Sequence, residues 1–132
     1  MATVTAAVTI SSAAGSLYTS ALSFTNTVDI TTLNTEGLSK ATITQTTIGA
    51  TCETLYTAGA YVAPAYIFIK NTETTAGNFI YVYDDTNSDT TILKLEAGDW
   101  AYMPLMATAT LKAYGTTANF GLEYMVFGTQ TT

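Results

Sequence analysis

Apolar and polar residues alternate along much of the chain, and a helical repeat is almost absent. Residues Thr3–Ile10 read TVTAAVTI, and residues Lys40–Ile48 read KATITQTTI. In the second segment, Ala41, Ile43 and Ile48 are the apolar positions among threonines. A period of two places apolar side chains on one face of an extended strand. Both segments are therefore predicted to be half-buried strands.

Two short runs are apolar or aromatic throughout, namely Ala65–Ile69 (AYIFI) and Phe79–Tyr83 (FIYVY). Because they are rich in β-branched and aromatic residues and bounded by turn residues, they are predicted to be central strands covered on both faces. The polar segment Asn71–Asn78 (NTETTAGN) between them is predicted to be a hairpin loop. Alternation puts Phe79, Tyr81 and Tyr83 on one strand face, as in a core or interface stripe.

From Tyr66 onward, predicted strands recur at intervals of about 10–14 residues, which is typical of a sandwich or barrel. The later ones are Thr91–Leu95, Trp100–Met103, Thr108–Tyr114 and Phe120–Phe127. The first third is less regular, with short strands predicted at Leu17–Phe24, Val28–Leu33 and Cys52–Tyr56. The pattern therefore predicts an all-β chain with about eight to ten strands.

The chain of 132 residues suits one domain. Residues 1–16 are uncharged, rich in small residues and prone to form a strand. They are predicted to be an N-terminal arm that adds to a neighbour's sheet edge or, alternatively, the first strand of the chain's own sheet. Residues 17–132 are then predicted to form the β-sandwich domain.

Charged residues make up only 11% of the chain, against about 25% in an average soluble domain. Threonine replaces them, and its β-branched side chain favours strands while its hydroxyl tolerates water. Since the centres of protein interfaces are depleted in charge, we expect other protein subunits to cover much of this surface. The net charge is −6, and Lys40, Lys70, Lys94 and Lys112 are scattered singly. Binding to nucleic acid or to an anionic membrane is therefore not expected.

The chain contains no histidine and no arginine, so the serine and cysteine schemes that need a histidine base are excluded. No glycine-rich phosphate loop is present. Paired carboxylates could still support glycoside hydrolysis, and the candidates are Asp84, Asp85, Asp89, Glu96 and Asp99. Only Lys94 is a basic residue near them, so we expect neither an enzyme nor a cofactor.

One acidic segment has the spacing of a calcium-binding loop. Asp85, Asn87 and Asp89 stand at alternate positions, and Glu96 falls at the twelfth. The match is incomplete, because Thr90 stands where that loop needs glycine and the flanking residues predict strands rather than helices. The residues are equally consistent with an ordinary acidic turn.

Cys52 is the only cysteine, so no disulfide can form within the chain. It is expected to be a small buried apolar residue rather than a reactive thiol. The tyrosines and Trp100 leave two alternatives open. Exposed, stacked rings would indicate glycan binding, whereas rings with one edge in the core would serve packing or an interface.

The segment Tyr66–Tyr124, with the five residues after it, contains YIFIKNTETTAGNFIYVYDD, ILKLEAGDWAYMPL and TLKAYGTTANFGLEYMVFGT. It resembles the small β-sandwich virion proteins of tailed bacteriophages, above all the head decoration (cement) proteins and less closely tail or fibre components. The resemblance covers a little under half of the chain. It implies a single-domain, antiparallel, jelly-roll-like β-sandwich that forms a homotrimer and acts through its surfaces.

The resemblance implies a non-enzymatic protein that binds and stabilises the lattice of a major capsid protein. A role in the tail, neck or fibre, with other virion proteins as partners, is the first alternative, and a carbohydrate-binding β-sandwich module is the second. The N-terminus lacks a basic segment followed by an unbroken apolar run. We therefore expect the chain to assemble in the host cytoplasm and to reside on the capsid surface of the virion.

Overall fold

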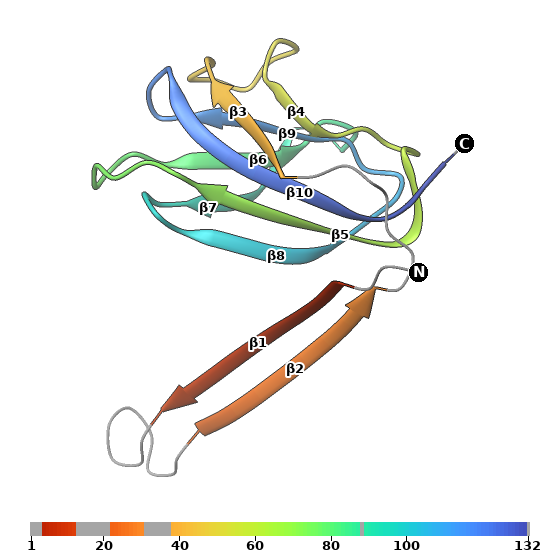
Figure 1. The fold of residues 1–132 in the computed structure, drawn as a ribbon. Helices are drawn as coiled ribbons and strands as arrows, with labels where there is room; N and C mark the ends of the chain where they lie inside the picture. Colours follow the sequence, from red (N-terminus) through yellow and green to blue (C-terminus); the bar gives the residue numbers. More distant parts are fainter. Residues whose placement is uncertain (1–3, 13–21, 31–37, 88, 132) are drawn as a thin grey trace. The chain divides into compact units, whose positions relative to one another are not determined.

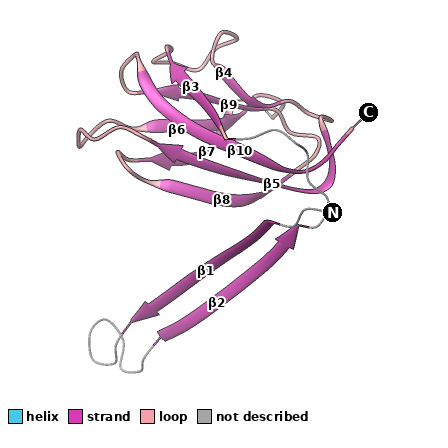
Figure 2. Cartoon of the chain, viewed as in Figure 1, coloured by secondary structure: helices cyan, strands magenta, loops and turns pink. Residues whose placement is uncertain are grey.

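The computed structural model describes residues 4–12, 22–30, 38–87 and 89–131. The chain divides into two compact units, Met1–Leu33 and Asn34–Thr132. Figures 1 and 2 show the strands of both units, and the described residues contain no helix that could cross a membrane.

The N-terminal unit is a β-hairpin. Strand β1 (Val4–Ser12) pairs in antiparallel fashion with β2 (Leu22–Ile30) in one unbroken register, from Val4↔Ile30 to Ser12↔Leu22. A single strand β2 therefore lies where two short strands, Leu17–Phe24 and Val28–Leu33, were predicted; residues 17–21 and 31–33 lie outside the described residues. The arm predicted at residues 1–16 contains β1, whose partner β2 belongs to the same compact unit.

The C-terminal unit consists of two four-stranded antiparallel sheets that pack against each other, which confirms the predicted all-β sandwich. The first sheet has the order β3-β10-β5-β8 and the second the order β4-β9-β6-β7. The strands are β3 (Ser39–Ile43), β4 (Glu53–Tyr56), β5 (Tyr61–Asn71), β6 (Ile80–Asp84), β7 (Thr90–Leu95), β8 (Trp100–Leu105), β9 (Leu111–Gly115) and β10 (Phe120–Gln130).

The chain crosses from one sheet to the other at every connection between β3 and β10 except β6–β7, which is a hairpin. Two interleaved four-stranded sheets with this order form a jelly roll. The hairpin predicted at Asn71–Asn78 is wrong, because β5 pairs with β10 and β8 while β6 pairs with β7 and β9. Both strands are nevertheless central in their sheets, as predicted.

The core lies between the two sheets and is built mainly from alternate residues of the central strands. Ile67 and Ile69 of β5 face Ile80 and Val82 of β6, and all four are fully buried. The other strands and the remaining positions of β5 complete this core with Ile43, Leu55, Tyr56, Tyr61, Leu95, Leu105, Leu111, Phe120 and Leu122. Successive side chains of a strand point to opposite faces, so the isoleucines of β5 point into the core and the residues between them point outward.

Asn71 is the one polar side chain that is buried among the described residues. Its side-chain amide donates to the carbonyl oxygens of Asn78 and Leu95, at 3.1 Å each, and its side-chain oxygen accepts the Glu73 amide at 3.0 Å. Its backbone also bonds to Asp99 and Gly98 in the β7–β8 turn. Asn71 therefore ties the end of β5 to two connections that cross between the sheets.

Candidate functional site

The acidic residues of the candidate calcium loop lie at both ends of β7. Asp85, Asn87 and Asp89 belong to the β6–β7 turn, whereas Glu96 follows the strand. Six extended residues span roughly 20 Å, so the strand separates Glu96 from the other three. Among the residues that the structure describes, no group of three or more carboxylate, cysteine or histidine side chains could hold a metal ion.

Asp85 of the candidate loop and the residue before it, Asp84, both have protein partners. Asp85 forms an ion pair with Lys112 at 2.8 Å. The neighbouring Asp84 accepts hydrogen bonds from the hydroxyl and the amide of Thr86, and the hydroxyl bond is the main cause that lowers the pKa of Asp84 below its usual value. Such contacts are those of an Asx-type turn, as expected if this segment is an ordinary acidic turn.

The segment 44–52 lies over the outer face of the β4-β9-β6-β7 sheet. The Tyr83 hydroxyl donates to the Gly49 carbonyl at 3.1 Å, and the Cys52 thiol donates to the Thr47 carbonyl at 3.3 Å. Both side chains are buried, so Cys52 has the expected place of a small apolar residue. Burial is the largest of the causes that raise the pKa of Tyr83 above its ordinary value.

We expect Tyr83→Phe to lower the free energy of unfolding by about 0.5–1.5 kcal/mol at neutral pH, because the Gly49 carbonyl loses one of its two donors and keeps only the Cys52 amide. A tyrosine with a raised folded-state pKa stabilises the protein below its unfolded pKa of about 10, and this contribution is lost as the pH rises. The wild type should therefore lose more stability above that pH than the variant. Urea unfolding at neutral and alkaline pH measures both effects, and parallel pH profiles would contradict the assignment.

Aromatic side chains gather on the outer faces of both sheets rather than only in the core. On the β4-β9-β6-β7 sheet, the Tyr81 and Tyr114 rings stack with centroids 4.9 Å apart. The Lys94 ammonium lies 3.7 Å from the centroid of the Phe79 ring, within the range of a cation–π contact. The predicted stripe of Phe79, Tyr81 and Tyr83 therefore lies outside the sheet, with Tyr83 beneath segment 44–52.

The second set of rings lies on the β3-β10-β5-β8 sheet, on the face opposite the core. The Tyr66 and Tyr102 rings are stacked, with centroids 5.6 Å apart and planes within 3°. Their neighbours are Phe68 against Trp100 at 6.3 Å and Phe127 against the edge of Tyr102 at 6.0 Å. We call these five residues (Tyr66, Phe68, Trp100, Tyr102 and Phe127) the aromatic face.

The aromatic face combines one exposed ring with several packed ones. Trp100, on the edge strand β8, keeps 56% of its surface exposed, whereas Phe127 keeps 9%. The hydroxyl of Tyr102 is buried without a hydrogen-bond partner, and burial is the main cause that raises its pKa. The stacking of Tyr66 on Tyr102 occupies one face of each ring.

Ionic residues border this surface at one end. Lys70 pairs in register with Trp100 on β8 and with Glu123 on β10. Glu123 in turn forms an ion pair with the exposed Lys40 at 3.2 Å. An apolar centre with a polar margin is the usual arrangement of a protein-binding surface.

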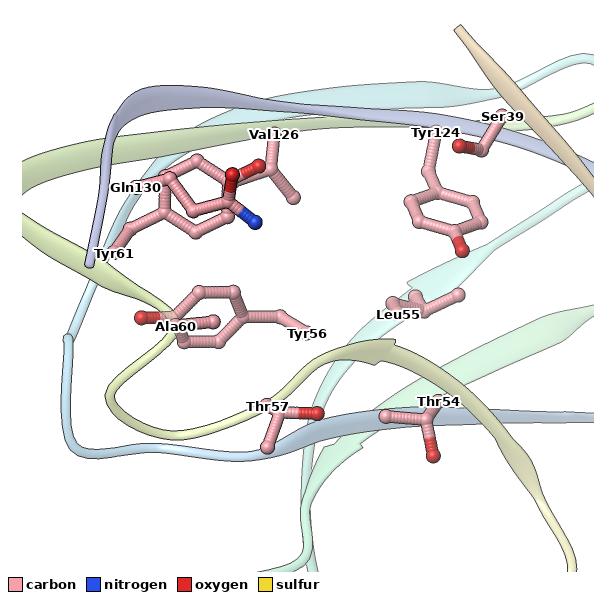
Figure 3. Close-up of a pocket in the computed structure, with 10 residues that line it drawn as sticks. All are labelled: Ser39, Thr54, Leu55, Tyr56, Thr57, Ala60, Tyr61, Tyr124, Val126 and Gln130. Carbon is pink, nitrogen blue, oxygen red and sulfur yellow. The ribbon is translucent and has the colours of Figure 1, made fainter. Parts of the chain in front are cut away.

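In the part of the chain that the structure describes, clefts open at two places between the sheets of the sandwich. Figure 3 shows the first, of about 170 Å³, in which Tyr56 and Tyr61 lie towards one end and Tyr124 towards the other. Its remaining lining residues are Ser39, Thr54, Leu55, Thr57, Ala60, Val126 and Gln130. No charged side chain lines it, so it offers no acid–base pair.

The second cleft, of about 180 Å³, lies between the edge strands β7 and β8. It is lined mostly by apolar side chains, of which Ile92 and Met106 remain 44% and 66% exposed. Its one ionisable residue is Asp84. A cleft of this composition suits an apolar side chain rather than a reacting substrate.

The aromatic face was not identified from the sequence, although the signal was present. In Ala65–Ile69, the aromatic residues Tyr66 and Phe68 alternate with Ala65, Ile67 and Ile69, and only the three aliphatic residues point inward. When aliphatic and aromatic residues alternate along a central strand, the two kinds lie on opposite faces of the sheet. Such a pattern predicts a second apolar face in addition to the core face.

No protein-family model matches the chain, and the searches of curated proteins and of solved structures give no significant match either.

Proposed function

We propose that this chain is a non-enzymatic structural protein of a virion, a capsid decoration protein that binds and stabilises the lattice of a major capsid protein. The observation that carries the proposal is the aromatic face, with Trp100 exposed at its edge. Tryptophan and tyrosine in an apolar patch with a polar margin are the side chains that dominate binding between proteins.

The fold and the composition support the same proposal. Jelly rolls form viral capsid domains, and they also form lectin domains. The resemblance of Tyr66–Tyr124 to small phage virion proteins favours the first of these uses. Scarce charge suits a surface that neighbouring subunits cover, and the net charge of −6 disfavours contact with packaged nucleic acid.

Quantitative mass spectrometry of purified particles, from the culture that carries this gene, tests the proposal. A decoration protein should be present at a copy number comparable to that of the major capsid protein. A few copies per particle would instead favour a place in the tail, neck or fibre. Absence from particles, together with specific binding on a glycan array, would replace the proposal with the carbohydrate-binding alternative.

A further inference from the structure

The β1–β2 hairpin has long, uninterrupted edges. Its nine residue pairs run from Val4↔Ile30 to Ser12↔Leu22 without a register shift. Among the described strands, neither β1 nor β2 pairs with a third strand. A two-stranded hairpin is only marginally stable by itself, and an unpaired strand edge accepts a strand from another chain.

The four edge strands of the sandwich carry features that hinder such pairing. Strands β3 and β4 are five and four residues long and contain Lys40 and Glu53. The β6–β7 pair has a register shift, and β7 contains Lys94. Strand β8 contains Pro104, which has no amide hydrogen to donate. Short length, charge, irregular register and proline are the means by which natural sheets block their edges.

Of these features, the hairpin has only a single charge. Its strands contain no proline and no lysine, and Asp29 is its only charged residue. Asp29 is also the only charge among residues 1–33, so five of the six net negative charges belong to residues 34–132. Two sandwich units of like charge repel each other, whereas two hairpins can approach with little electrostatic cost.

We infer that the β1–β2 hairpin is the element through which copies of this chain associate, by edge-to-edge pairing with the hairpin of a second copy. Such pairing adds hydrogen bonds between backbones along the hairpin edge and converts two marginal hairpins into one larger sheet. The inference concerns contacts between copies of this chain and stands without the virion assignment.

Light scattering on the full-length chain tests this inference with two matched double variants. Ala7→Lys/Thr9→Lys adds two charges in the middle of β1, and Thr42→Lys/Thr44→Lys adds two charges on and just after the edge strand β3. All four positions are exposed, and both variants change the net charge by the same amount. Lysines in the paired strands of two hairpins meet like charges, whereas lysines at β3 do not.

We expect the wild type and the β3 variant to have at least twice the 13.9 kDa mass of one chain, and the β1 variant to have the mass of a monomer. A wild type that stays monomeric at high concentration would overturn the inference. An oligomeric β1 variant would overturn it too, and loss of the oligomer in the β3 variant alone would place the contact on the sandwich.

A spin-label experiment distinguishes contact between two hairpins from other ways in which copies could associate. It does not require the lysine variant to fold. The label is attached to Ala7→Cys in a Cys52→Ser background. We expect dipolar broadening between labels of two copies, which disappears when labelled chain is diluted with unlabelled chain. An oligomer without broadening would show that the hairpin pairs with a sandwich edge or not at all, and would overturn the inference.

Discussion

Replacing Asn71 with leucine is expected to lower the free energy of unfolding by about 3–5 kcal/mol, the largest effect of any single substitution that we predict. The side chain is fully buried and makes three hydrogen bonds. Leucine has a similar size but offers no donor or acceptor. The carbonyl of Leu95 would then stay buried without the donor that it has in the wild type.

Leaving a buried polar group without a partner costs about 1–3 kcal/mol, and the exchange affects three such groups, two of them only partly buried. The two connections that Asn71 joins lead directly into β6 and β8, which belong to different sheets. The loss of these hydrogen bonds should therefore destabilise both sheets. Urea unfolding followed by circular dichroism measures the change as a lower midpoint.

Asn87→Ala is the matched control, because Asn87 is exposed in the β6–β7 turn. A surface substitution of this kind should change stability by no more than about 0.5 kcal/mol. If Asn71→Leu also stays within about 1 kcal/mol of the wild type, Asn71 does not hold the two crossing connections together.

Replacing Trp100 with alanine is expected to weaken binding to the partner lattice by about 2 kcal/mol or more, which is roughly a 30-fold loss of affinity. This prediction rests on the proposed function. Trp100 lies at the edge of the aromatic face with more than half of its surface exposed, so its removal should leave the fold intact. Co-sedimentation with particles that lack the protein measures the affinity.

Ile92→Ala is the matched control for binding, because Ile92 is an exposed apolar residue on an edge strand of the other sheet. We expect it to bind like the wild type. Equal losses in both variants would mean that the aromatic face has no special part in binding, and a loss for Ile92→Ala alone would move the contact to the cleft between β7 and β8.

Much of the fold could be predicted because period-two alternation is a local signal. The runs Ala65–Ile69 and Phe79–Tyr83 were predicted as central strands, and they lie in β5 and β6 at the centres of the two sheets. Their separation into different sheets could not be read from Asn71–Asn78, because a polar turn sequence fits a hairpin loop and a crossing connection equally well.

The candidate surface was harder to predict than the fold. Tyrosine can pack with its ring in a core and its hydroxyl at the surface, so composition leaves its place open. Tyr56 and Tyr61 lie in the core, whereas Tyr66 and Tyr102 lie on the outer face of the β3-β10-β5-β8 sheet. Alternation along β5 places Tyr66 on the outer face, and the pairing of β5 with β8 and β10 brings its ring together with those of Tyr102 and Phe127, which are far away in the sequence.

The most direct test of the proposed function is a cryo-electron microscopy map of particles from the culture that carries this gene. We predict density for the jelly roll repeated over the outer surface of the head, with the aromatic face against the major capsid protein and Trp100 in the contact. A capsid without this density, or a bound jelly roll whose aromatic face is open to solvent, would contradict the proposal.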